Sequence, residues 1–172
     1  MNKERTGIIT LKGNPATLLG PDVGVGAMAP EFTVVDNGLQ PVTLADSKGK
    51  IRLITTVPSL DTPTCDTMTR RFNQDCAALP AEVVIDTISL DLPFAQKRWC
   101  GNAGIARVRT LSDYRERSFA SAYGLMCKEL MLLTRAVLII DRSGKIVYRQ
   151  IVPEVTAEPD YAATLLALQA LL

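Results

Sequence analysis

Residues 57–65 read Val57-Pro58-Ser59-Leu60-Asp61-Thr62-Pro63-Thr64-Cys65. The run before them, residues 51–57, is apolar and β-branched and predicts a buried strand that ends at Pro58. After the prolines and threonines of the turn, Cys65 begins a helical pattern of apolar residues. A helix N-terminus carries unpaired N–H groups and a partial positive charge, which favour a thiolate over a thiol. Many free cysteines are simply small buried hydrophobic residues, so position alone leaves a reactive and a structural Cys65 equally open.

The totals of the sequence limit the class of protein. With 172 residues, of which 47% are hydrophobic and 22% charged, we expect one globular domain, residues 1–172. A formal net charge of +1 gives no electrostatic reason to expect nucleic acid or an anionic membrane as a partner. No apolar run approaches the roughly 20 residues of a membrane span. Residues 1–7 lead into a short alternating segment and not into a signal-peptide core, so we expect a cytoplasmic protein.

The sequence contains no histidine, and this excludes many enzyme classes. Cysteine and serine hydrolases that use a histidine base are excluded, as are nearly all catalytic zinc sites. The four cysteines, at positions 65, 76, 100 and 127, form no C-x₂-C pair of the kind that metal sites and dithiol motifs use. In a reducing compartment structural disulfides are not expected either. We therefore predict no cofactor and no metal, and cysteine chemistry activated by arginine, hydroxyl groups and a helix end.

The order of the predicted elements indicates a thioredoxin-like α/β fold. Residues 8–12 and 16–19 form a β-hairpin around Gly13-Asn14, which would be an N-terminal extension of a three-layer sandwich. Further strands are predicted at residues 32–35, 42–44, 51–57, 83–90, 108–111, 135–141 and 145–151. Helices are predicted at residues 65–79, 93–100 and 115–123, and from residue 160 to near the C-terminus. We expect Pro80 to end the first helix, and Gly101 or Asn102 to end the second in a left-handed conformation.

Two of the cysteines have structural explanations. Cys76 continues the apolar stripe of the first helix, which contains Cys65, Met68 and Phe72 at spacings of three and four. We therefore expect Cys76 to lie in the core. Cys127 is predicted to lie in a partly exposed loop, as an inert thiol or, alternatively, as a partner in a regulatory disulfide.

Pro58, Thr62 and Cys65 form the pattern P-x-x-x-T-x-x-C, which suits the meeting of a peroxide with a thiolate. Pro58 would end the strand and shield the sulfur from water, and the Thr62 hydroxyl would bind a peroxide oxygen. An arginine from another part of the chain would complete such a site, because a guanidinium stays protonated and donates in a fixed fork.

The longer patterns around these residues resemble a known family. They are Pro58-Ser59-x-Asp61-Thr62-Pro63-x-Cys65 and Ser89-x-Asp91-Leu92-Pro93-Phe94-Ala95-Gln96-x-Arg98-Trp99-Cys100. Together they resemble the bacterial thiol peroxidases, which are atypical two-cysteine peroxiredoxins of the thioredoxin-like superfamily. The resemblance covers nearly the whole chain, from the N-terminal hairpin through Pro153-Glu154-Val155-Thr156 and Glu158-Pro159-Asp160-Tyr161. It implies that Cys65 is the peroxidatic cysteine and Cys100 the resolving one, with Pro58, Thr62 and Arg135 completing the site. Arg115 and Arg149 lack the strand-start context of Arg135.

By this resemblance the protein reduces hydrogen peroxide and organic hydroperoxides through a sulfenate on Cys65 and an intramolecular disulfide. A thioredoxin-type reductant would reopen that disulfide, and the resemblance also implies a homodimer. One alternative is a dithiol redox carrier, which would need C-x-x-C where Cys65 is followed by Asp66, Thr67 and Met68. Another is a non-catalytic thioredoxin-fold binding module with an unreactive Cys65.

Overall fold

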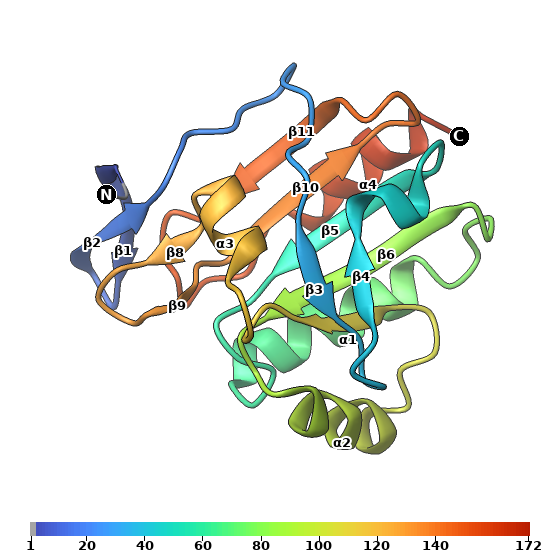
Figure 1. The fold of residues 1–172 in the computed structure, drawn as a ribbon, viewed down its shortest axis with the longest axis horizontal. Helices are drawn as coiled ribbons and strands as arrows, with labels where there is room; N and C mark the ends of the chain where they lie inside the picture. The colour runs from blue at the N-terminus through green and yellow to red at the C-terminus, as the bar shows by residue number, and fades with distance from the viewer. Residues whose placement is uncertain (1–2) are drawn as a thin grey trace.

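The computed structural model describes residues 3–172. Its larger sheet has the strand order β11-β10-β5-β6-β7-β3-β4, in which β5, β6 and β7 are parallel (Figure 1). The other pairings in this sheet are antiparallel. The strands span Thr33–Val35 (β3), Pro41–Thr43 (β4), Ile51–Thr56 (β5), Val83–Ser89 (β6), Arg109–Ser112 (β7), Ala136–Ile140 (β10) and Ile146–Ile151 (β11).

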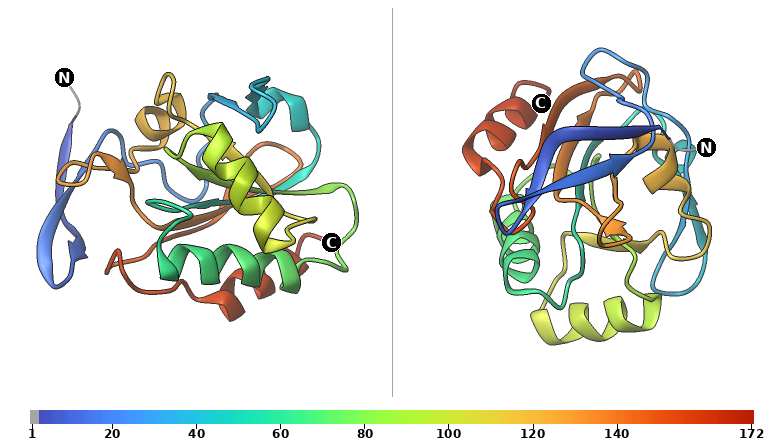
Figure 2. Two further views of the ribbon diagram at one scale, coloured as in Figure 1. Left: turned by 90° about the horizontal axis from the view of Figure 1, so that it is seen from below. Right: turned by 90° about the vertical axis from the view of Figure 1, so that its left-hand side faces the viewer.

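Helices cover both faces of this sheet. They span Pro63–Asp75 (α1), Pro93–Ala103 (α2), Ser118–Tyr123 (α3) and Tyr161–Gln169 (α4), and a 3-10 helix spans Leu44–Ser47 (η1). Figure 2 shows α1 and α4 on one side of the sheet and α3 on the other, and α2 packs against β7. Each face has its own apolar core, one around Phe72 of α1 and one around Phe119 of α3. This is the predicted three-layer arrangement.

The strand β5 lies near the middle of the sheet, and all six of its residues are buried. Leu53 contributes to the core under α1 and Ile54 to the core under α3. Because both faces of β5 are covered, its sequence is continuously apolar or β-branched instead of alternating. The strand predicted at residues 51–57 is therefore confirmed as Ile51–Thr56, one residue shorter, and it leads to the turn that precedes Cys65.

The N-terminal hairpin is longer than predicted and belongs to a second sheet. Its strands are Glu4–Leu11 (β1) and Asn14–Leu19 (β2). They form a four-stranded sheet with Met126–Cys127 (β8) and Leu132–Leu133 (β9), in the order β1-β2-β8-β9. The expectation of a partly exposed loop at Cys127 is wrong. Cys127 is fully buried, because β8 pairs with β2 and places it opposite Leu18 under the hairpin.

Three helix boundaries also differ from the predictions, each because of local backbone geometry. The helix α1 ends at Asp75, and residues 76–79 continue as tight turns, with Leu79 N–H donating to Cys76 O. The helix α2 continues through Gly101 and Asn102 and ends where Gly104 adopts a left-handed conformation, with φ of 65°. The helix α3 begins only at Ser118, since Arg117 before it has φ of 50°. Within residues 3–172, no helix is both long and apolar enough to cross a membrane.

Gly124, which ends α3, lies close to the backbone that follows β2. It has φ of +62°, and a Cβ atom there would overlap the carbonyl oxygen of Pro21 and press on the Arg5 guanidinium. We expect Gly124→Ala to destabilise the protein by about 3 kcal/mol or more, because the overlap is with backbone that cannot move freely. Urea denaturation of the purified variant measures this cost.

Gly104→Ala is the matched control. Gly104 has nearly the same φ, +65°, but nothing lies within 4 Å of an added Cβ. Its cost should be limited to the left-handed conformation, about 1–2 kcal/mol. Equal losses in the two variants would mean that the close approach of Gly124 to Pro21 contributes nothing.

Candidate active site

The end of β5 and the start of α1 place the predicted reactive cysteine. The chain leaves β5 at Thr56 and passes the buried Pro58, and Thr62 then caps α1 with extended backbone, φ −96° and ψ 145°. Pro63 is the first helical residue, where its missing N–H costs no helix bond. Cys65 is the third residue of α1 and is fully buried. Its sulfur therefore lies within the first turn, as the sequence predicts.

The Thr62 hydroxyl touches the sulfur directly. Thr62 Oγ1 lies 2.7 Å from Cys65 Sγ and 3.2 Å from the carbonyl oxygen of Ser59. A hydroxyl has one proton but two acceptor lone pairs. It can therefore donate to Ser59 O while accepting from a thiol, or turn to donate to a thiolate, so Thr62 can partner both states of the sulfur.

Arg135 reaches the same sulfur from the neighbouring strand. It immediately precedes β10, whose first residue Ala136 pairs with Thr56 at the end of β5. Its Nη2 lies 3.3 Å from Cys65 Sγ, its Nη1 lies 3.4 Å from Met68 Sδ, and its Nε donates to Val155 O at 3.2 Å. The side chain is 1% exposed, and among residues 3–172 no carboxylate forms an ion pair with it. The guanidinium can therefore donate a hydrogen bond to the Cys65 sulfur, whether the sulfur is a thiol or a thiolate.

The Asp91 carboxylate, to which the sequence pattern gave no role, binds the loop between Pro58 and Thr62. Asp91 accepts from Ser59 Oγ (2.7 Å), from Leu60 N (2.8 Å) and from Ser89 Oγ (2.8 Å). It thereby ties this loop to the end of β6 and to the start of α2. The quoted pattern Ser89-x-Asp91 contains the signal, but its partners lie some 30 residues away in the sequence.

A surface hollow adjoins the site. Its volume is about 320 Å³, and it is lined by Leu60, Asp61, Thr62, Pro63, Asp66 and Trp99. Asp66 accepts from Trp99 Nε1 at 2.9 Å and pairs with Arg70, whose Nη1 donates to Ala103 O. The first two turns of α1 are thus bound to the last turns of α2. Thr62 lines this hollow and also contacts the Cys65 sulfur, whereas Cys65 itself is fully buried.

Cys100 is not brought into contact with Cys65. It is half-buried on α2, with its sulfur 3.2 Å from Thr110 Oγ1 and 3.9 Å from Asn37 Nδ2. Both cysteines are free thiols in this structure. The structure therefore brings Thr62 and Arg135 to the Cys65 sulfur and buries Pro58 in the preceding loop. It places Cys100 on α2, at Thr110.

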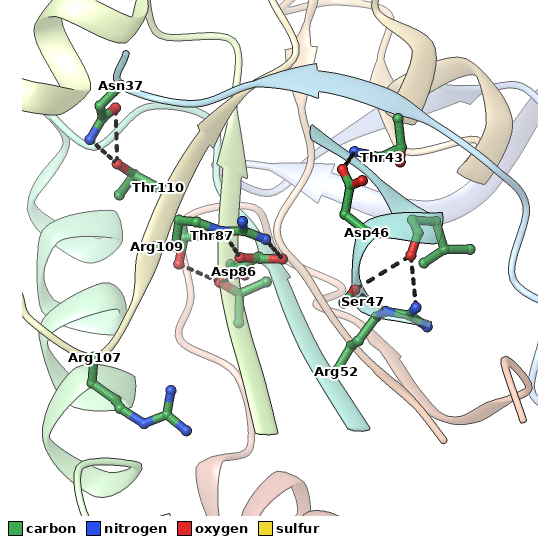
Figure 3. Close-up of polar contacts among 12 residues, drawn as sticks. Asn37, Thr43, Asp46, Ser47, Arg52, Asp86, Thr87, Arg107, Arg109 and Thr110 are labelled. Atoms are coloured by element: carbon green, nitrogen blue, oxygen red, sulfur yellow. Dashed lines mark hydrogen bonds and ion pairs between the residues drawn. The ribbon is translucent and has the colours of Figure 1, made fainter. Parts of the chain in front are cut away.

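A second hollow, of about 220 Å³, lies at the opposite end of β5 and β6. Arg109 forms a two-point ion pair with the buried Asp86 there, and Arg52 donates to Ser47 (Figure 3). The hollow is lined by three bases, Lys50, Arg107 and Arg109, and by two acids, Asp46 and Asp86, and no predicted site residue lines it. Within residues 3–172, no cluster of three acidic or cysteine side chains is placed to hold a metal ion.

The chain is similar to proteins of a known family. The Redoxin family model matches residues 24–165. The chain belongs to the Redoxin family. It is 54% identical to the thiol peroxidase of Halalkalibacterium halodurans over 95% of this chain and 98% of that protein, and 52% identical to that of Bacillus subtilis over 95% and 97%. The chain is accordingly a thiol peroxidase, a peroxiredoxin enzyme, as the motif resemblance implied.

A solved structure confirms the fold of this Redoxin-family enzyme. The structure of a peroxiredoxin-like protein from Aquifex aeolicus superposes with a TM-score of 0.91, at 44% identity, over 98% of each chain. The predicted thioredoxin-like sandwich with its N-terminal hairpin is therefore correct.

The two cysteines outside the candidate site should be unreactive in the folded enzyme. Burial, with a smaller effect of Asp75, raises the pKa of Cys76 to about 11, and burial also raises the pKa of Cys127. Only about a thousandth of Cys76 is then thiolate at pH 8. We expect iodoacetamide at pH 8 to modify Cys100 in the native enzyme and to modify Cys76 and Cys127 only after denaturation, as measured by peptide mass spectrometry. Equal labelling of Cys127 and Cys100 in the native enzyme would contradict its burial under the hairpin.

Proposed function

We propose that this enzyme reduces hydrogen peroxide and organic hydroperoxides with Cys65 as the peroxidatic thiolate. The observation that carries the proposal is the position of the Cys65 sulfur between the Thr62 hydroxyl and the Arg135 guanidinium, at 2.7 Å and 3.3 Å. The thiolate attacks the terminal peroxide oxygen, and the O–O bond breaks. Cys65 becomes a sulfenic acid, and the alkoxide or hydroxide that leaves takes up a proton to form alcohol or water. Arg135 and Thr62 donate hydrogen bonds to the oxygens on which charge develops.

Cys100 is proposed to resolve the sulfenic acid. Its thiol attacks the Cys65 sulfur, forming an intramolecular disulfide and releasing water, so that two electrons from the thiol pair balance the reduction of one peroxide. The Cα atoms of a disulfide lie within about 7 Å of one another, and in the reduced state the two sulfurs have separate partners. The last turns of α2 therefore leave Thr110 and release the Trp99–Asp66 bond for this step to occur.

A thioredoxin-type dithiol is the proposed reductant, since the disulfide must be reopened by thiol exchange for turnover. A second copy of the chain is the proposed partner. Leu92 and Phe94 at the start of α2 support this assignment, because they are 52% and 65% exposed and stand next to Asp91, which binds the site loop. An interface with a second copy would remove these two exposed apolar side chains from water.

Arg135→Ala tests the first step. Removal of the guanidinium should slow oxidation of Cys65 by hydrogen peroxide by more than about tenfold, the loss of at least one charge-assisted hydrogen bond. Single-turnover stopped-flow kinetics measures the rate constant. Arg115→Ala is the control, because Arg115 is exposed and contacts only Tyr114 among the described aromatic rings. An unchanged rate in Arg135→Ala would remove this residue from the reaction.

Peptide mapping tests the second step. One equivalent of peroxide should convert the reduced enzyme into a species with Cys65 linked to Cys100 inside one chain, without covalent dimers on a non-reducing gel. In Cys100→Ser the sulfenic acid should form at a near-normal rate and then persist or over-oxidise, because it has no resolving partner. Thioredoxin-dependent turnover should collapse while the single-turnover rate survives. A link from Cys65 to Cys76, to Cys127 or to a second chain would refute the assignment of Cys100.

A further inference from the structure

Glu154, in the segment that follows β11, has an unusually complete set of hydrogen-bond donors. Its Oε1 accepts from the backbone N–H groups of Lys12 and Thr156, each at 3.0 Å, and from Thr156 Oγ1 at 2.7 Å. Its Oε2 accepts from Thr10 Oγ1 at 2.8 Å and from Gly13 N at 3.0 Å. These hydrogen bonds, that of Gly13 first, lower the pKa of the Glu154 carboxyl well below its ordinary value. The group is therefore an anion at any working pH.

These donors come from two parts of the chain that are distant in sequence. Three belong to the β1–β2 hairpin and two to Thr156 in the segment 152–156. Backbone hydrogen bonds also join the two parts: Thr10 N–H donates to Pro153 O at 2.7 Å, and Val155 N–H donates to Thr10 O at 2.9 Å. Val155 is buried in the small core under the hairpin. Glu154 thus fastens the hairpin turn to this segment.

The same segment reaches the active site at two points. Val155 O accepts from Arg135 Nε at 3.2 Å, and Val152 N donates to Arg135 O at 3.0 Å, so both the side chain and the backbone of Arg135 are bound to it. Thr156 O accepts from Thr64 Oγ1 at 3.2 Å, and Thr64 directly precedes Cys65. A shift of residues 152–156 therefore moves the groups that set the distance between guanidinium and sulfur.

We propose that Glu154 is a positioning residue for the peroxidase reaction, which fixes residues 152–156 against the hairpin and so holds Arg135 at the Cys65 sulfur. The proposal rests on the role of Arg135 proposed above. It gives the N-terminal hairpin a part in catalysis, although none of its residues contacts the sulfur. A carboxylate is required, because both of its oxygens accept from backbone N–H groups, which can only donate. A glutamine amide would turn its own N–H groups toward at least one of them.

Glu154→Ala and Glu154→Gln, with Asp141→Ala as a matched control, test this proposal. Asp141 accepts from Ser143 N, Ser143 Oγ and Lys145 N in the β10–β11 turn, so its removal also deprives a turn of its carboxylate acceptor. This turn lies at the end of β10 and β11 that is remote from Arg135 and Glu154. Two quantities are measured in a Cys100→Ser background: the single-turnover rate with hydrogen peroxide, and the pH profile of Cys65 alkylation. Both Glu154 variants should slow oxidation by about tenfold and move the midpoint of the pH profile upward, because a displaced guanidinium stabilises the thiolate less. Asp141→Ala should lower the melting temperature and change neither quantity.

Combination with Arg135→Ala separates the possible outcomes. If Glu154 acts through Arg135, the double variant should be no slower than Arg135→Ala alone. An additive loss, or Glu154 variants that lower only the melting temperature, would overturn the proposal. If Arg135→Ala itself retains the full rate, the proposed site fails and not this inference alone. Should Glu154→Ala fold poorly, Thr10→Val removes one donor and should shift the rate and the pH profile in the same directions by less; no shift would again overturn the proposal.

Discussion

The burial of the Arg135 guanidinium against the Cys65 sulfur is the constraint on which the rest of this structure depends. A cation with 1% exposure and no carboxylate partner among residues 3–172 is costly unless an anion forms beside it. Its three contacts are a thioether, a carbonyl oxygen and the sulfur of Cys65. Only the last can become negative, and the described residues give the guanidinium no carboxylate partner. The contact with the sulfur requires β5 and β10 to be adjacent, because one strand leads to Cys65 and the other begins just after Arg135.

Hydrogen-bonded carboxylates outside the cores hold the backbone around this pair. Asp91 binds the loop between β5 and α1, and Glu154 binds residues 152–156, which hydrogen-bond to Arg135. Each accepts mainly from backbone N–H and hydroxyl groups and not from cations, so its effect is geometric. The reactive pair is thus located by polar contacts at its edges and by apolar packing of Phe72 and Met68 beneath it.

The parts of the fold that depend on short-range pattern could be predicted from the sequence. The buried strand at residues 51–57, the hairpin around Gly144 and the cysteine in the first turn of a helix follow from periodicity, proline and glycine positions. The end of α2 was misplaced, because Gly101, Asn102 and Gly104 are all capable of ending a helix, and the surrounding contacts decide among them. Cys127 was misplaced because its burial comes from pairing with a strand more than a hundred residues earlier. Asp91 and Glu154 were missed for the same reason, since a carboxylate in a turn looks solvated until its distant donors are known. Sequence pattern also could not position Cys100, whose proposed role rests on family resemblance.

The contact between Trp99 and Asp66 has a spectroscopic consequence. Trp99 is the only tryptophan in the chain, and it is 9% exposed. Its indole N–H donates to Asp66, the residue after Cys65, and Trp99 itself directly precedes Cys100 in the sequence. The indole emission spectrum depends on burial and on charged groups nearby. Any separation of α1 from α2 would expose the Trp99 indole to water. It would also move the indole away from Asp66 and from the Arg70 guanidinium, which lies 5.6 Å from the ring. The enzyme therefore carries its own optical probe at the junction between the two cysteine-bearing helices, and no label has to be introduced to follow that junction in real time.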